Sequence, residues 1–181
     1  TLADGLAVSK AGALAVSIAG PRLDQIVIVE RLELAIAVVR LMELEKSVVE
    51  GAGAASLAAI LGNKLPELTG KKVVLLLCGG NIDLQVLNRL IDAALVADGR
   101  LARFTAEISD RPGGLAKFAS LLQEIGVSVQ DIVHDRTFCG PNIAAVNVLC
   151  TVETRDAAHL AELYERLTAA GFRHFAHVGR E

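Results

Sequence analysis

The sequence predicts an α/β segment with a parallel sheet over residues 1–98, followed by an α+β segment of βαββαβ order over residues 99–181. The α/β prediction depends on five consecutive apolar residues at 73–77, which are typical of a strand buried on both faces. The α+β prediction depends on the succession of alternating and helical apolar patterns in the second segment. The turn residues Asp98 and Gly99 mark the change between them.

The composition indicates a folded protein, with 52% hydrophobic residues and a mean hydropathy of +0.47. No apolar run is long enough to cross a bilayer, and a net charge of −3 without a basic run argues against nucleic acid as a partner. The three cysteines form no CxxC pair, which is typical of a reducing compartment, so we expect a cytoplasmic protein. His174 and His177 would point to opposite faces of a predicted strand, so we expect no metal site.

Two strands and three helices are predicted in the first segment. The β-branched run at 26–29 and the apolar run at 73–77 predict the strands. In the predicted helix 30–46, the polar residues fall on one narrow strip, so we expect most of its surface to be buried. The other two helices are predicted at 54–61, ending at Gly62, and at 84–96.

The second segment has the periodicities of four strands and two helices. Together they predict a ferredoxin-like sandwich, in which two helices cover one antiparallel sheet. The strands are predicted at 103–108, 127–135, 143–152 and 172–178, and the helices at 113–125 and 156–169.

The end of the central apolar run is the best candidate site in the first segment. Cys78 is the last side chain before the pair Gly79-Gly80, and a helix is predicted to begin shortly afterwards. In open α/β sheets, ligands bind at the carboxyl ends of the strands, where glycines let the backbone approach a ligand closely. The spacing alone is equally consistent with a purely structural turn.

Residues 77–83, Leu-Cys-Gly-Gly-Asn-Ile-Asp, resemble the SGGN(I/V)D segment of the serine/threonine dehydratases and serine racemases. These enzymes use pyridoxal phosphate (PLP) and have fold type II. In that family a Ser or Cys at this position hydrogen-bonds the pyridine nitrogen of the cofactor. The resemblance therefore implies that Cys78 contacts PLP.

Two further segments resemble the same family. Residues 49–55 match its EGAGAA segment beside the cofactor ring, and residues 1–8 match its T(I/L)ADGIAV segment. Without the resemblance, Glu50 would be interpreted as a carboxylate that complements the dipole of a helix N-terminus. With it, the implied cofactor-binding residues are Cys78, Gly79, Gly80, Asn81, Glu50 and Gly51.

The lysine that forms a Schiff base with PLP in the dehydratases stands in an S-F-K-x-R-G segment, and a tetraglycine loop holds the phosphate. Neither segment occurs in this sequence, so no catalytic residue is assigned. In the family both precede the T(I/L)ADGIAV segment. The resemblance therefore implies the C-terminal portion of a threonine (serine) dehydratase, which alone would be inactive.

The second segment resembles the ACT domain, a regulatory module that binds amino acids. Its matching stretches are 110–116, Asp-Arg-Pro-Gly-Gly-Leu-Ala, and 126–136, which fit the pattern DRPGxLA … GxNIxDIxHxR. Ser128 replaces the usual Asn of that pattern. ACT domains commonly pair side by side, so the resemblance implies a homo-oligomer and an amino-acid effector. The implied effector-binding residues are Asp110, Pro112, Gly113, Gly114 and Ser128.

Three alternatives stay open. The chain is an amino-acid-sensing ACT dimer in which residues 1–97 are only a scaffold, or it derives from a serine racemase. In the third alternative, the N-terminal catalytic part is a separate chain that docks on residues 1–97. Without that part, the largely apolar region 30–62 would expose a large patch.

Overall fold

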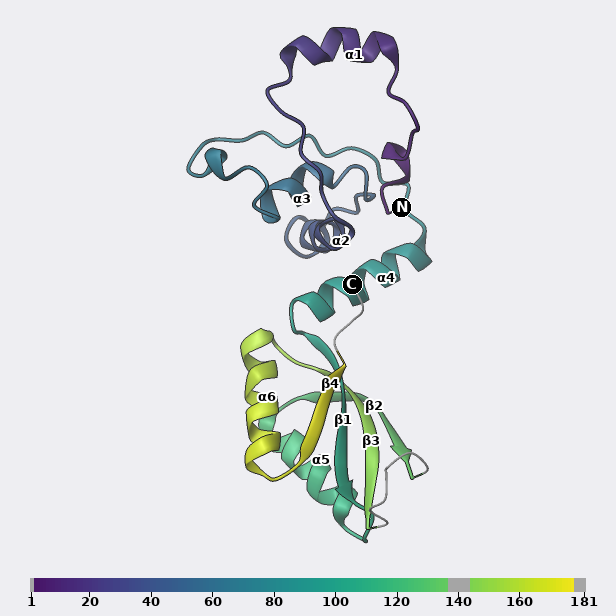
Figure 1. Cartoon of the computed structure of the whole chain (residues 1–181), viewed down its shortest axis with the longest axis vertical. Coiled ribbons are helices and arrows are strands. Elements are labelled where there is room, and N and C mark those ends of the chain that lie inside the picture. Colours follow the sequence, from purple (N-terminus) through teal and green to yellow (C-terminus); the bar gives the residue numbers. More distant parts are fainter. Residues whose placement is uncertain (1, 137–143, 178–181) are drawn as a thin grey trace. The chain divides into compact units, whose positions relative to one another are not determined.

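The chain folds into two units with separate cores, as the computed structural model of residues 2–136 and 144–177 shows (Figure 1). The units comprise Thr1–Ala94 and Leu95–Glu181. Helix α4 (Leu84–Ala97) crosses the division between them. Each unit is therefore described by itself.

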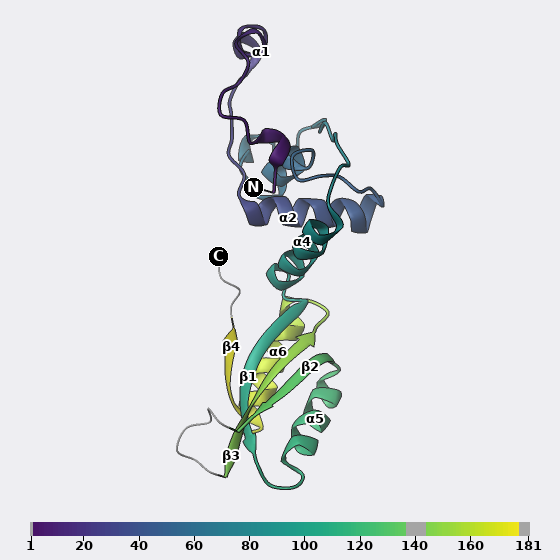
Figure 2. The ribbon, with the colours of Figure 1, turned by 90° about the vertical axis from the view of Figure 1, so that its right-hand side faces the viewer.

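The second unit is a four-stranded antiparallel sheet in the order β2-β3-β1-β4, and Figure 2 shows both of its helices on one face. This confirms the predicted βαββαβ order, which is compatible with a ferredoxin-like ACT domain. Its elements are β1 (Leu101–Ser109), α5 (Gly114–Ile125), β2 (Ser128–Asp135), β3 (Ala145–Glu153), α6 (Ala157–Ala169) and β4 (Arg173–His177).

Aromatic packing forms the core of this unit. Alternate residues of β1 and β3 point toward the helices, and Phe104 on β1 is completely buried. Its ring lies edge-to-face against Phe118 of α5 and Tyr164 of α6, with centroid distances of 6.4 and 5.9 Å. Phe104 therefore connects both helices to the sheet.

His159, at the start of α6, is a fully satisfied core histidine. Its Nδ1 accepts a hydrogen bond from the backbone N–H of Arg155 at 3.1 Å, so Nε2 carries the proton and donates to the carbonyl of Ile125 at 3.0 Å. The side chain is buried and joins the start of α6 to the end of α5. Asp156 caps the same helix by accepting from the backbone N–H of His159.

The first unit is helical. Its helices are α1 (Ala13–Ala19), α2 (Arg31–Arg40), which continues through a π-type turn at Leu41–Glu45, α3 (Ala55–Leu61), and α4 up to the division; 3-10 turns lie at Asp4–Leu6, Gly20–Arg22 and Pro66–Leu68. The predicted helices at 30–46, 54–61 and 84–96 are confirmed.

Helices α2 and α3 form the centre of the first unit. Leu34, Ala37 and Val38 of α2 are buried with Ala58 of α3 in one cluster, as the strip of polar residues on α2 predicts. An ion pair of 2.9 Å between Lys64, just after α3, and Glu33 of α2 fastens the two helices together. The pKa of Glu33 is lowered, first by the backbone N–H of Glu30 and then by Lys64.

The prediction of strands at 26–29 and 73–77 is wrong for this structure. Both segments are extended, but neither forms a ladder, and the parallel sheet expected in the first unit is not present among the described residues. A strand exists only when a neighbour supplies hydrogen-bond partners along its length. The described residues of the first unit provide no such neighbour for either segment.

Both extended segments nevertheless keep the alternation of strands. Ile26, Ile28 and Leu76 are 79–82% exposed, whereas Val27, Val29 and Leu75 turn toward α3. The inward residues line an apolar cavity of about 440 Å³. Helix α1 stands apart from α2 and α3 in both views and has no buried residue (Figures 1 and 2). The first unit therefore has a large uncovered apolar surface.

We expect Phe118→Ala to destabilise the second unit by about 3–5 kcal/mol, because it leaves a cavity beside Phe104. Tyr164 is the only tyrosine and Trp is absent, so tyrosine fluorescence during urea unfolding reports on this unit alone. Gln123→Ala, an exposed substitution on the same helix, is the control and should change the unfolding free energy by less than about 0.5 kcal/mol. Equal effects of the two substitutions would contradict the aromatic core.

Candidate functional site

Three segments that are far apart in the sequence meet in the first unit. The backbone N–H of Glu50 donates to the carbonyl of Gly79 at 3.0 Å. A Cβ on Gly53 would lie 1.6 Å from the carbonyl oxygen of Cys78, and a Cβ on Gly51 would lie 2.1 Å from that of Leu2. Only glycine permits these approaches. The segments 2–5, 49–53 and 78–80 therefore form one site, as the resemblance of all three to one family implies.

The thiol of Cys78 is accessible at this site. Cys78, Gly80 and Asn81 are exposed, and Gly79 has a φ of +82°, which L side chains rarely adopt. The loop thus presents a thiol next to two residues without side chains.

Glu50 supports the glycine loop from one side. Its carboxylate lies where a Cβ on Gly79 would come within 2.5 Å of it, so the two residues are packed closely. Its backbone carbonyl accepts from the N–H of Ala54, which leads into α3. Gly51 is buried against Leu2 and not open at the surface. Within this site, Gly51 therefore holds the segments together, while Cys78 and Gly80 face outward.

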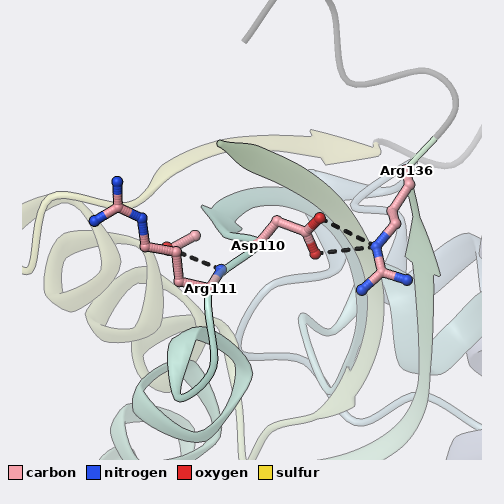
Figure 3. Close-up of polar contacts among 4 residues, drawn as sticks. Asp110, Arg111 and Arg136 are labelled. Carbon is pink, nitrogen blue, oxygen red and sulfur yellow. Dashed lines mark hydrogen bonds and ion pairs between the residues drawn. The ribbon is translucent and has the colours of Figure 1, made fainter. Parts of the chain in front are cut away.

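The second unit has a shallow hollow of about 310 Å³ where β1 leads into α5 and β2 ends. Asp110 accepts two hydrogen bonds from Nε of Arg136, at 3.0 and 3.1 Å, and Figure 3 shows these side chains pointing toward each other. Arg111 points away from this pair (Figure 3). The Arg136 side chain is 68% exposed, so the ion pair contributes little stability and is easily rearranged.

The hollow contains only part of the predicted effector set. Asp110, Pro112 and Gly113 line it. Gly114 does not, because it packs on the carbonyl of Ser109, where a Cβ would come within 2.0 Å. Ser128 pairs with Glu153 at the opposite end of β2.

His134 and Arg136 line the hollow but were not among the predicted effector residues. They stand two apart on β2 or directly after it, and so share a face. Both belong to the stretch 126–136 that matches the ACT pattern. Their spacing, combined with the β1–α5 turn at the same end of the sheet, was the signal that could have identified them.

Residues 2–136 and 144–177 contain neither a candidate metal site nor a candidate membrane span. No group of three or more His, Cys, Asp and Glu residues is placed to hold a metal ion there. Within the same part of the chain, no helix has the length and apolar character to span a membrane. Cys150 is buried in the core of the second unit, where burial raises its pKa to about 11 and keeps the thiol protonated. Cys139 lies outside the described residues.

The known proteins to which this chain is similar are named as threonine ammonia-lyases and threonine dehydratases. The chain is 40% identical over 172 residues to a protein of Geobacter sulfurreducens named L-threonine ammonia-lyase, and 38% identical over 172 residues to one of the same name from Thermotoga maritima. Each alignment covers 95% of this chain and 42% of the relative. No protein-family model matches the chain.

A shorter similarity falls on half of the chain. The catabolic L-threonine dehydratase TdcB of Escherichia coli is 40% identical over 91 residues, which is 50% of this chain and 28% of that protein. The chain thus spans less than half the length of these relatives. Their names agree with the family that the three converging segments resemble.

We expect Gly53→Ala to disrupt the site, because the new methyl group would overlap the Cys78 carbonyl and push residues 78–80 away from Glu50. The loss of packing should amount to about 1–3 kcal/mol. Hydrogen exchange at the Glu50 amide, which is bonded to Gly79, should become faster. Gly20→Ala is the matched control, since Gly20 is helical and has nothing within 4 Å of a Cβ. Unchanged protection of Glu50 in the Gly53 variant would refute the contact.

Proposed function

We propose that this chain supplies part of a PLP-dependent threonine (serine) dehydratase, which converts threonine to 2-oxobutanoate and ammonia. The convergence of residues 2–5, 49–53 and 78–80 carries the proposal, because three separate motifs of that family meet at one accessible thiol. The relatives named L-threonine ammonia-lyase support the same substrate. A serine racemase is the alternative within the same cofactor family.

The residues at this site fit a pyridoxal ring. Cys78 offers an exposed thiol as the hydrogen-bond partner of the ring nitrogen, and Gly79, Gly80 and Asn81 continue the same exposed loop. When bound, PLP supplies an electron sink for bond cleavage at the substrate Cα. Cys78 does not fix a positive charge on the ring nitrogen as a carboxylate would. It therefore favours elimination of the substrate hydroxyl over slower chemistry at Cα.

The uncovered apolar surface of the first unit supports a further catalytic part. The exposed sides of segments 26–29 and 73–77 are apolar like their inward sides, which is typical of strands in a sheet that is covered on both faces. We infer that polypeptide outside these 181 residues supplies the neighbouring strands, the cofactor lysine and the phosphate loop. The same apolar surface would bind the further catalytic part whether that part is continuous with this chain or is a separate chain.

We expect no formation of 2-oxobutanoate from threonine by this chain with added PLP. Its six lysines lack the expected context: Lys64 is ion-paired with Glu33, and the Lys46 ammonium donates to the Glu43 carbonyl at the end of α2. Borohydride reduction and peptide mapping should show only scattered labelling. Turnover, or stoichiometric labelling of one lysine such as Lys46, would overturn the proposed division of the active site.

The second unit is proposed to bind an amino acid that regulates the catalytic part. In the hollow, a carboxylate and a guanidinium lie side by side in an exposed ion pair. A zwitterion can replace that pair with two new ones, its ammonium bonding Asp110 and its carboxylate bonding Arg136. Regulation follows only if the amino acid binds two states of the enzyme unequally. Without a catalytic partner, the same unit would act as an amino-acid sensor, which is the second candidate function.

Titration of the chain with isoleucine, valine and threonine tests the hollow. Asp110→Asn should weaken binding of the preferred amino acid about tenfold or more, because the ligand ammonium loses its charged partner. Arg136→Gln should act similarly through the carboxylate. Glu162→Gln, an exposed charge removal on α6, is the control and should leave the binding heat unchanged. Equal binding by all three variants would exclude the Asp110–Arg136 pair as the effector site.

A further inference from the structure

The sheet of the second unit has a face that neither of the unit's own helices covers. Helices α5 and α6 both lie on the other face (Figure 2). The strand registers arrange the side chains of the uncovered face, called here the open face, in three rows across β2, β3, β1 and β4. The rows are Asp131–Thr151–Arg103–His177, Val133–Leu149–Thr105–Phe175, and Asp135–Asn147–Glu107–Arg173.

The middle row of the open face is largely apolar. Phe175 is 66% exposed and Val133 is 47% exposed, with Leu149 half-buried between them. Thr105 completes the row, and its hydroxyl is hydrogen-bonded to His177 at 2.8 Å. An exposed phenylalanine in a largely apolar row on a sheet is typical of an interaction surface.

The charges of the open face are separated by strand. The β2 side is acidic, with Asp131 and Asp135, whereas Arg103 and Arg173 make the β1–β4 side basic, together with His177 and opposed by Glu107 alone. Arg103 is held in place by its hydrogen bond to Thr151 at 3.0 Å. A surface that is acidic on one side and basic on the other is complementary to its own copy.

Two copies of the open face can be related by a two-fold axis that places complementary side chains opposite each other in every row. A rotation about an axis parallel to the strands, between β1 and β3, lays β2 over the partner's β4 and keeps the rows in line. Val133 then faces the partner's Phe175, and Asp131 faces the partner's His177 beside the partner's Arg103. A two-fold axis across the strands would instead bring Asp131 near the partner's Asp135 and His177 near the partner's Arg173, with Arg103 and the partner's Glu107 as the one complementary pair. The charges therefore select the first axis.

We infer that the open face pairs with the open face of a second copy of this chain, in a two-layer sandwich about that axis. The middle row becomes the dry centre of the interface, and the charged rows fix its direction. This interface differs from a side-by-side pairing through the free edge of β2, which would leave the open face uncovered. It does not depend on the proposed enzymatic activity.

Thiol cross-linking between two versions of the chain tests the pairing. Val133→Cys is placed in one version and Phe175→Cys in a second, size-tagged version, both with Cys78 and Cys139 replaced by serine. Stacked sheets lie about 10 Å apart, beyond the reach of a disulfide, so a short bifunctional maleimide is used. The mixture should give a several-fold excess of the mixed dimer over both homodimers.

Val129→Cys replaces Val133→Cys in the matched control. Val129 is also on β2 and 41% exposed, but its register with Val152 places it on the helix-covered face. This control measures any association through the apolar surface of the first unit. Mixed dimer at the control level, or predominant Val133–Val133 and Phe175–Phe175 products, would overturn the proposed pairing.

Charge reversal provides an independent test on the same cross-linking background. Asp131→Lys alone, or Arg103→Glu alone, places like charges opposite each other twice in a homodimer and should lower the cross-linking about tenfold or more. A mixture of the two variants restores opposite charges at both positions, and the cross-linking should recover. Failure to recover in the mixture, when each variant still shows the tyrosine fluorescence of the folded unit, would also overturn the pairing.

Discussion

The close approach of three backbone segments at Gly51 and Gly53 is the constraint on which the first unit depends. At each of these glycines a single methyl group would collide with a carbonyl oxygen, of Leu2 or of Cys78. Without these contacts the Cys78 loop would have no fixed position relative to Glu50 and the start of α3. The position of the candidate cofactor site therefore depends more on close packing at these glycines than on polar interactions.

The two units differ in how completely they bury their apolar residues and pair their extended segments. The second unit pairs all four of its strands and buries Phe104, Phe118 and Leu163 completely, so it has the core of an independent domain. The first unit buries α2 against α3 but leaves its extended segments without neighbours. This contrast agrees with the proposal that the first unit is completed by further polypeptide, and the chain spans 42% of the length of the two relatives from Geobacter sulfurreducens and Thermotoga maritima.

The two candidate sites and the open face consist of solvent-accessible groups whose interactions contribute little to stability. The Asp110–Arg136 pair is exposed and can exchange its partners for those of a zwitterion. The thiol of Cys78 is exposed, whereas that of Cys150 is buried and protonated. The open face lies on the side of the sheet opposite the hollow, so the proposed pairing of two copies would leave the Asp110–Arg136 pair accessible.

The sequence by itself determined the elements whose partners lie within the described residues. The periodicity of α2, α5 and α6 and the alternation of β1 and β3 predicted helices and strands correctly, since each of these elements buries one face against others in its own unit. Residues 26–29 and 73–77 have the same local signals but form no strand, because a ladder needs a partner that the described residues do not provide. Only the tertiary structure shows that Arg136 lies beside Asp110 and that Ser128 lies at the end of β2 away from the hollow. It also shows that the acidic and basic residues of the open face lie on opposite halves of the sheet. These depend on strand register, which joins residues that no sequence pattern connects.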